Sequence, residues 1–187
     1  AGKLRPHRRR VQIVFQDPYR SMNPRITVGD FITEGPMNFG LGKDEAMARA
    51  RKLMETVRLD PSSLDRYPHQ FSGGQRQRIC IARALAMEPE LLIADEAVSA
   101  LDVSVQKQVL ELLDEIRQRL NLAVLFITHD LRVAAQICDY VAVMSKGRVV
   151  EYGAAEQVFE NPTHEYTKSL FAAAPGRNWE FGKFAAA

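Results

Sequence analysis

Two carboxylates, Asp95 and Glu96, directly follow the apolar run of residues 91–94. A compact apolar run of this kind predicts a strand that is buried on both faces. A carboxylate at the carboxyl end of such a strand holds magnesium in many nucleotide hydrolases. The next carboxylate can then polarise the attacking water as a general base. An ordinary strand that ends in exposed acidic residues has the same sequence, so the pair alone leaves both interpretations open.

The tetrapeptide from Ser72 to Gln75 reads Ser-Gly-Gly-Gln and leads into a predicted helix of residues 75–87. Two glycines let the backbone approach a polyanion closely, and the serine hydroxyl adds another donor. The helix beginning at Gln75 would aim its N–H groups and positive dipole end at the same place. The alternative is a plain glycine loop between two helices.

Polar side chains also follow two further predicted strands. Residues 11–15 predict a short strand that ends at Gln16, and residues 123–128 predict another buried strand, followed by His129. At these positions Gln16 could contact the metal or the water, and His129 could hydrogen-bond a γ-phosphate. Taken singly, a histidine is more often a satisfied surface or core group, and a glutamine carries little information.

The elements that must position these residues alternate between strand and helix from residue 91 onward. An amphipathic helix over 105–120 and a helix over 131–138 separate the predicted strands. This order predicts an α/β fold with a parallel sheet, on which the helical residues 28–88 form an insertion. Further expected elements are a turn-rich loop at 17–25, a helix at 43–59, a hairpin of strands 140–144 and 148–152, short helices near 154–160 and 164–173, and a tail without clear periodicity at 176–187.

Composition excludes several classes of protein. The 187 residues carry a formal net charge of only +2, which argues against a nucleic-acid binder. The basic cluster of Lys3, Arg5 and residues 8–10 predicts a solvated approach to a strand. Cys80 and Cys138 lie in apolar helical patterns and are expected to be buried, reduced thiols. The sequence has no apolar run near the ~20 residues that a membrane-spanning helix needs.

In their order along the chain, these motifs resemble the ATP-binding subunits of ABC transporters, from about residue 4 to residue 175. The resemblance implies the C-terminal part of an ABC-type (RecA-like) nucleotide-binding domain, a parallel sheet with an inserted helical subdomain. The matching motifs are Gln16 for the Q-loop, Phe71–Gln75 for the signature, 91–96 for Walker B, 99–102 for the D-loop and His129 for the switch histidine. The implied parts are 1–27 (end of a core strand and Q-loop), 28–88 (helical subdomain with signature), 89–153 (core) and 154–187 (C-terminal helices and tail).

The segments 4–6, 14–25, 161–167 and 173–175 are similar to dipeptide and oligopeptide importers of this family. The chain also departs from the family pattern. Phenylalanine stands at Phe71 where leucine is commoner, Ala-Val follows Walker B where Pro-Thr is commoner, and a C-terminal cysteine cluster found in some of these subunits is missing. Because Asp95, Glu96 and Asp102 are present, little consequence is expected from the Ala-Val replacement.

The resemblance implies ATP and Mg²⁺ as ligands and an ATPase that drives peptide import. In the family, two subunits pair head to tail around two ATP molecules. The implied roles are metal contacts for Asp95 and Gln16, catalysis by Glu96 and His129, and nucleotide contacts for Gln16, Ser72, Gly73, Gly74, Gln75 and Asp102, with Ser72, Gly73 and Gly74 serving the partner's ATP.

The implied partners are a second, identical or different ATP-binding subunit, transmembrane permease subunits and, indirectly, an extracytoplasmic substrate-binding protein. Nucleic acid is not an expected partner. The implied location is cytoplasmic, peripheral on the inner face of the cell membrane. Two alternatives remain open, a soluble ABC ATPase that is not coupled to transport and a non-enzymatic pairing module.

The phosphate-binding pattern G-x-x-x-x-G-K-[ST], called Walker A, is not found in the 187 residues. Ala1-Gly2-Lys3 resembles its end only superficially, because Leu4 stands where Ser or Thr is required. We therefore expect the chain to be the C-terminal part of a longer subunit, or the end of a fused protein with two such domains. Alone, it is expected to be catalytically incomplete.

Overall fold

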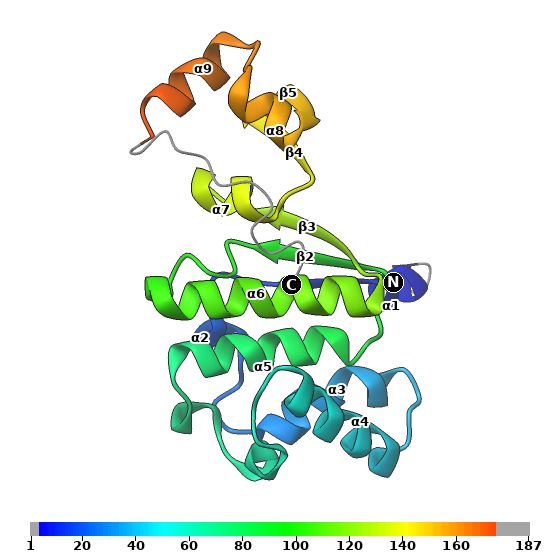
Figure 1. Ribbon diagram of the computed structural model, residues 1–187. Coiled ribbons are helices and arrows are strands. Elements are labelled where there is room, and N and C mark those ends of the chain that lie inside the picture. The colour runs from blue at the N-terminus through cyan, green and yellow to red at the C-terminus, as the bar shows by residue number, and fades with distance from the viewer. Residues whose placement is uncertain (1–3, 175–187) are drawn as a thin grey trace. The chain divides into compact units, whose positions relative to one another are not determined.

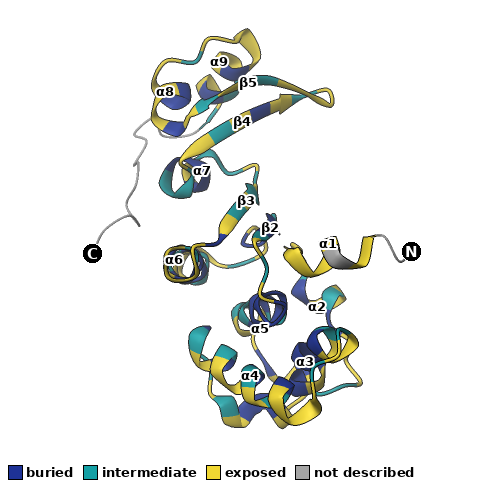
Figure 2. Cartoon of the chain, turned by 90° about the vertical axis from the view of Figure 1, so that its right-hand side faces the viewer, coloured by how far each residue is buried: buried dark blue, intermediate teal, exposed yellow. Residues whose placement is uncertain are grey.

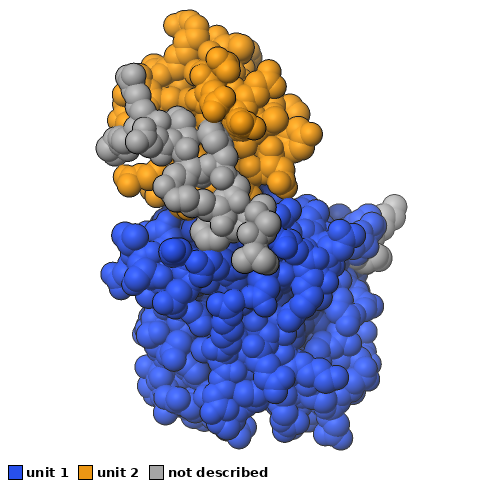
Figure 3. All heavy atoms as spheres, viewed as in Figure 1, with its two compact units in different colours: residues 1–127 blue, residues 128–187 orange. Residues whose placement is uncertain are grey.

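The computed structural model describes residues 4–174. The chain divides into two compact units, Ala1–Ile127 and Thr128–Ala187, which Figure 3 distinguishes by colour. The expected tail at 176–187 lies outside the described residues. The first unit contains α1 (Arg5–Arg10), β1 (Val11–Val14), α2 (Pro18–Ser21), α3 (Val28–Asn38), α4 (Lys43–Thr56), the 3₁₀ turns η2 (Pro61–Asp65) and η3 (Pro68–Gln70), α5 (Gly73–Leu85), β2 (Leu91–Asp95), α6 (Val103–Leu120) and β3 (Ala123–Ile127).

A parallel sheet in the order β1-β2-β3 lies along one side of the first unit, with helices α3 to α6 on the same side of it (Figure 1). The register pairs Val14 with Ala94 and Asp95 with Ile127. The carboxyl ends of all three strands therefore lie at one edge of the sheet. The predicted α/β class is confirmed, and helices α2 to α5 occupy the chain between β1 and β2, as expected for an insertion.

The prediction that the third strand is fully buried is wrong. Leu125 is 51% exposed and Ile127 is 45% exposed. The reason is that β3 is an outer strand, and alternate residues of the sheet point to a face that the described residues leave partly open. On the opposite face, Leu92 and Ala94 are buried against the helices.

The inserted helices α3, α4 and α5 pack their apolar faces together (Figure 2). The predicted helix at 43–59 is confirmed as α4, on which Ala50 and Met54 are fully buried. The helix ends at Thr56, a little earlier than expected, and Arg58 then adopts a left-handed backbone with φ 59°. A residue in that conformation cannot continue a right-handed helix.

Two segments that were expected to be irregular form short helices. In the turn-rich loop, the Asp17 side chain accepts hydrogen bonds from the amides of Tyr19 and Arg20 and so caps α2. Within the basic cluster, Arg5 and residues 8–10 belong to α1, which leads straight into β1 and where they are exposed as predicted, whereas Lys3 lies outside the described residues. Arg10 pairs with Glu90 through two hydrogen bonds of 2.6 and 2.5 Å, which tie the end of α1 to the start of β2.

The second unit contains the predicted hairpin and short helices. Its elements are α7 (Leu131–Ile137), β4 (Tyr140–Ser145), β5 (Arg148–Ala154), α8 (Ala155–Glu160) and α9 (Glu165–Ala172). β4 and β5 are antiparallel. In the core of this unit, the rings of Phe159 and Phe171 stack with their centroids 4.7 Å apart. No helix among residues 4–174 combines the length and apolar character needed to cross a bilayer.

Glu151 of β5 anchors the segment that precedes α9. One carboxylate oxygen accepts hydrogen bonds from the Thr163 amide (2.7 Å) and hydroxyl (2.9 Å), and the other accepts from the His164 amide (3.1 Å). Desolvation raises the pKa of Glu151, but the bonds from Thr163 and His164 outweigh it and lower the pKa from 4.5 to about 2. Hydrogen bonding to the charged form is therefore the dominant influence.

This lowered pKa predicts a pH-dependent contribution to stability. A carboxylate with a depressed folded pKa stabilises above its unfolded pKa near 4.5, and the contribution is lost as pH falls toward 2. Glu151→Gln should lower the free energy of unfolding in urea by about 1 kcal/mol at pH 7. The difference from wild type should shrink between pH 4.5 and pH 2. Glu160→Gln, at an exposed position of the same unit, is the control, and an equal pH-dependent difference there would contradict the assignment.

Both cysteines are free thiols. Cys80 is buried, as predicted, whereas Cys138 is only partly buried. Burial raises the pKa of the Cys80 thiol to about 12 and that of Cys138 to about 11. Thiols with raised pKa values are poor nucleophiles, so neither is a candidate for catalysis.

Candidate functional site

The carboxyl edge of the parallel sheet gathers the predicted metal-binding residues of the first unit. Asp95 is the last residue of β2, and Gln16 follows the end of β1 by two positions. β1 and β2 are direct neighbours, so the structure places both residues at the same edge. Asp95 is half-buried and Gln16 is exposed. Crevices at the carboxyl edge of parallel sheets are the usual ligand sites of α/β folds.

The backbone at Glu96 is unusual. Its φ is 48°, in the left-handed region that non-glycine residues seldom occupy. Its amide donates to the carbonyl of Ile127 at 2.9 Å, which adds one hydrogen bond to the β2–β3 ladder beyond Asp95. Strained backbone of this kind persists where the surrounding structure enforces it, and it is frequent at active sites. No local pattern of residues indicates this strain.

A tight turn follows Glu96 and leads into α6. The amide and hydroxyl of Ser99 donate to the carbonyl of Glu96 at 3.1 and 3.0 Å. Asp102 is the N-cap residue of α6, but its side chain makes no capping hydrogen bond and is exposed. The Asp102 carboxylate is therefore not used to cap α6, and its predicted contact with nucleotide stays a prediction.

The Ser-Gly-Gly-Gln segment forms the start of α5. The helix begins at Gly73, two residues earlier than predicted, because Ser72 is its N-cap. The Ser72 hydroxyl oxygen accepts from the Gln75 amide (3.3 Å), and the Gln75 side chain accepts from the Ser72 amide (2.9 Å). The amides of Gly73 and Gly74 therefore take no part in this reciprocal capping box, and binding of an anion at this helix start stays a prediction.

The two glycines of this segment face different surroundings. A Cβ atom at Gly73 would meet only Leu101 Cδ2, at an ordinary 3.9 Å, whereas one at Gly74 would lie 2.4 Å from Val105 Cγ1. Gly74 is therefore required by the close approach of α5 to α6, a role that the sequence reasoning missed. Gly73 remains available for close approach by a ligand.

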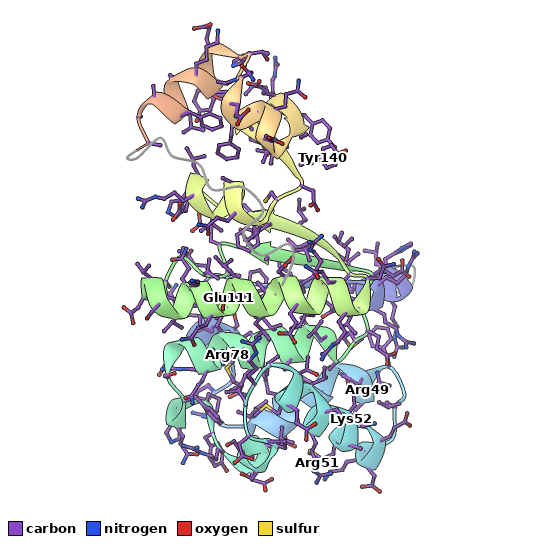
Figure 4. All side chains as sticks on the ribbon, viewed as in Figure 1. Arg49, Arg51, Lys52, Arg78, Glu111 and Tyr140 are labelled. Carbon is purple, nitrogen blue, oxygen red and sulfur yellow. The ribbon has the colours of Figure 1, made fainter. Side chains whose placement is uncertain are left out.

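Helices α5 and α6 run side by side beyond this contact. Arg78 of α5 donates to the side chain of Gln108 at 2.8 Å, and Figure 4 labels Arg78 where the two helices meet. Desolvation, followed by the charge of Arg58, lowers the pKa of Arg78. The Ser-Gly-Gly-Gln segment at the start of α5 and the turn at residues 99–102 before α6 are therefore held together by the packing of these two helices.

His129 belongs to the second unit. It follows the last residue of β3 by two positions and precedes α7, whose N-cap Asp130 accepts from the Arg132 amide at 2.9 Å. His129 is exposed. Its position after a strand agrees with the prediction, and its role there stays a prediction.

A magnesium site built from protein ligands alone is not present among residues 4–174, which hold no group of three or more His, Cys, Asp or Glu side chains that could bind a metal. Mg²⁺ normally takes one or two carboxylates and fills its remaining positions with water and phosphate oxygens. The half-buried Asp95 carboxylate at the sheet edge fits that pattern. Gln16 offers an amide oxygen at the same edge.

Residues 2–99 match the family described as "ABC transporter". The chain belongs to the ABC transporter family. Its Gln16, Ser72–Gln75, Asp95–Glu96 and Asp102 are the positions at which the family motifs were recognised in the sequence, and the structure places each of them at a strand end, a helix start or the turn between them.

Several relatives of this ABC family chain are named import ATP-binding proteins. A protein of Brucella ovis provisionally named as a peptide import ATP-binding protein is 51% identical over 176 residues, which cover 94% of this chain and 56% of the relative. The glutathione import ATP-binding protein GsiA of Salmonella typhi is 55% identical over 176 residues, 94% of this chain and 28% of the relative. The chain thus spans about half, or less, of these relatives' length.

A solved ABC structure has the same fold. CbiO1 of Clostridium perfringens, described as part of the ABC transporter complex cbiONQ, matches with a TM-score of 0.74 and 32% sequence identity. The match covers 82% of this chain and 61% of that one. The likeness confirms the predicted ABC-type fold.

Proposed function

We propose that this chain is part of the ATP-hydrolysing, energy-coupling subunit of an ABC importer for peptides. The observation that carries the proposal is the pair Asp95 and Glu96 at the carboxyl edge of a parallel sheet, next to the strand that precedes Gln16. The importer class is supported by relatives named for the import of peptides and of glutathione. The segments at 14–25 and 161–175 support the peptide class as well.

In the proposed mechanism, Asp95 and Gln16 would hold Mg²⁺, and the ion would supply positive charge that offsets the charge on the ATP phosphates. Glu96 takes a proton from the attacking water as general base. Glu96 is half-buried and directly follows Asp95, the last residue of β2. His129 hydrogen-bonds the γ-phosphate and stabilises the charge that develops there.

The start of α5 serves a second nucleotide in this proposal. Ser72, Gly73 and Gly74 face the ATP that a second ATP-binding subunit holds, and Gln75 and Asp102 also contact nucleotide.

The remaining partners and the location follow from this role. We propose that the subunit binds transmembrane permease subunits on the cytoplasmic side of the membrane and acts with an extracytoplasmic substrate-binding protein. We also propose four functional parts, with boundaries at residues 1–27, 28–88, 89–153 and 154–187. The second of these parts contains the helices α3 to α5.

The test is reconstitution of the full-length subunit with its permease subunits in lipid vesicles. We expect ATP hydrolysis that depends on Mg²⁺ and increases when the binding protein is loaded with peptide. Hydrolysis that is indifferent to the permease would favour a soluble ABC ATPase instead. A full-length subunit that binds its partner without hydrolysing ATP would favour a pairing module.

A second prediction concerns the 187-residue chain by itself, which has no G-x-x-x-x-G-K-[ST] segment. That segment supplies most of the backbone and lysine contacts to ATP phosphates in nucleotide-binding folds. Titration with Mg-ATP, followed by calorimetry, should therefore show no saturation up to about 1 mM, equivalent to a binding free energy weaker than about −4 kcal/mol. Micromolar binding would contradict this expectation.

A further inference from the structure

Gln77, in the second turn of α5, is a fully buried amide at 0% exposure. Glutamine is seldom fully buried, because both polar ends of its side chain need partners. Its Nε2 donates to the carbonyl oxygen of Phe15 at 3.5 Å, the long limit of a hydrogen bond. Its Oε1 is buried and has no hydrogen-bond partner among residues 4–174. An unsatisfied buried polar atom destabilises a fold, so stability does not account for a glutamine here.

The acceptor, the carbonyl oxygen of Phe15, lies just beyond the last residue of β1 that pairs with β2. β1 ends at Val14, whose pairing with Ala94 is the last in the β1–β2 register. Phe15 follows directly, and its carbonyl shares one planar peptide unit with the amide of Gln16. A side chain that holds this oxygen therefore fixes the orientation of the peptide plane from which Gln16 projects.

A second contact holds the chain on the other side of Gln16. The guanidinium of Arg76 lies 5.2 Å from the ring centroid of Tyr19, within cation–π range. Arg76 and Gln77 are consecutive residues of α5, so Gln16 is bracketed by two contacts from one turn of that helix. The same helix begins with the Ser-Gly-Gly-Gln segment.

We propose that Gln77 is a positioning residue for Gln16. It holds the Phe15–Gln16 peptide unit against α5 and thereby sets where the Gln16 side chain stands at the edge of the sheet. The inference rests on the proposed function, in which Gln16 contacts the metal or the water. Gln77 itself touches neither nucleotide nor metal in this account.

The test is Gln77→Met in the full-length subunit with its permease subunits. Methionine has nearly the same length and volume, and it removes both the donor and the unpartnered oxygen. We expect an unfolding midpoint equal to or above that of wild type, because a long hydrogen bond and an unsatisfied acceptor disappear together. We expect kcat to fall about 10- to 100-fold with little change in KM, because misplacement of a reacting group by about 1 Å can cost 10²-fold.

Two further variants separate positioning from structure. Thr33→Val removes another buried side-chain hydrogen bond, from the Thr33 hydroxyl to Gly29 at 2.8 Å, and should lower the unfolding midpoint without changing kcat or KM. In a Gln16→Ala background, Gln77→Met should have no further effect on kcat, since residues that act as a unit are not additive. A full additional loss in that background, or a Gln77→Met kcat near wild type, overturns the proposal.

A spectroscopic measurement keeps the inference independent of the proposed function. If the wild-type subunit hydrolyses no ATP, the proposed function fails, and the backbone amide order parameter of Gln16 in the 187-residue chain decides the inference. We expect it to fall from about 0.85 to below about 0.6 in Gln77→Met, the change from rigid to flexible backbone. An unchanged order parameter overturns it.

Discussion

Replacing Glu96 by glutamine in the full-length subunit should lower ATP hydrolysis about 10²- to 10⁴-fold while leaving ATP affinity nearly unchanged. The amide has the shape of the carboxylate but cannot take a proton from the attacking water. The strained backbone at φ 48° and the hydrogen bond from the Glu96 amide to Ile127 hold the residue in place, so the substitution should not disturb the fold. Hydrolysis at saturating Mg-ATP and the nucleotide affinity are the measurements.

Glu90→Gln is the matched control, because Glu90 immediately precedes β2 at the opposite end from Glu96. It is exposed and pairs with Arg10. Surface substitutions usually change free energies by no more than about 0.5 kcal/mol, so the control should hydrolyse ATP within about twofold of wild type. If Glu96→Gln also stays near wild type, Glu96 is not the base.

Gly74→Ala should lower the free energy of unfolding by about 1–3 kcal/mol, the usual effect of inserting an extra carbon into a packed interface. The new Cβ would lie 2.4 Å from Val105 Cγ1, so the Val105 side chain or the N-terminal ends of α5 and α6 must shift. Hydrolysis should fall with it, since the shift displaces both the Ser-Gly-Gly-Gln segment and the turn at 99–102. Urea unfolding and ATPase rates measure the two effects.

Val105→Ala removes the atom with which the new methyl group collides, so the double variant should recover most of the lost stability. Gly73→Ala is the control for helix propensity: it meets only Leu101 Cδ2 at 3.9 Å, and stability should stay within about 1 kcal/mol of wild type. Its hydrolysis should still fall if the Gly73 backbone approaches a phosphate. Wild-type stability of Gly74→Ala, or no recovery in the double variant, contradicts the packing role of Gly74.

These outcomes would divide the Ser-Gly-Gly-Gln motif into two functions. Gly74 fits α5 against α6, and Gly73 remains accessible to a ligand. Substitution of Gly74 is thus expected to lower stability and hydrolysis, whereas substitution of the neighbouring Gly73 is expected to lower hydrolysis alone.

Much of the fold could be predicted because its signals are local. The apolar runs at 11–15 and 91–94 identified β1 and β2, and the helical spacing at 105–120 identified α6. Once these elements alternate, their carboxyl ends must meet at one edge of a parallel sheet. The sequence by itself therefore determined that Gln16 and Asp95 lie at a common edge, and the order of the motifs indicated the family.

Only the tertiary structure decided which elements lie against each other and how closely. Gln77 meets Phe15 across 62 residues, and Gly74 meets Val105 of the next helix. Periodicity shows which side of a helix or strand is apolar, but it does not show what covers that side. For this reason the exposure of Leu125 and Ile127 was mispredicted, and the strained backbone at Glu96 was missed. Such features arise from packing between distant segments, which no local pattern of residues records.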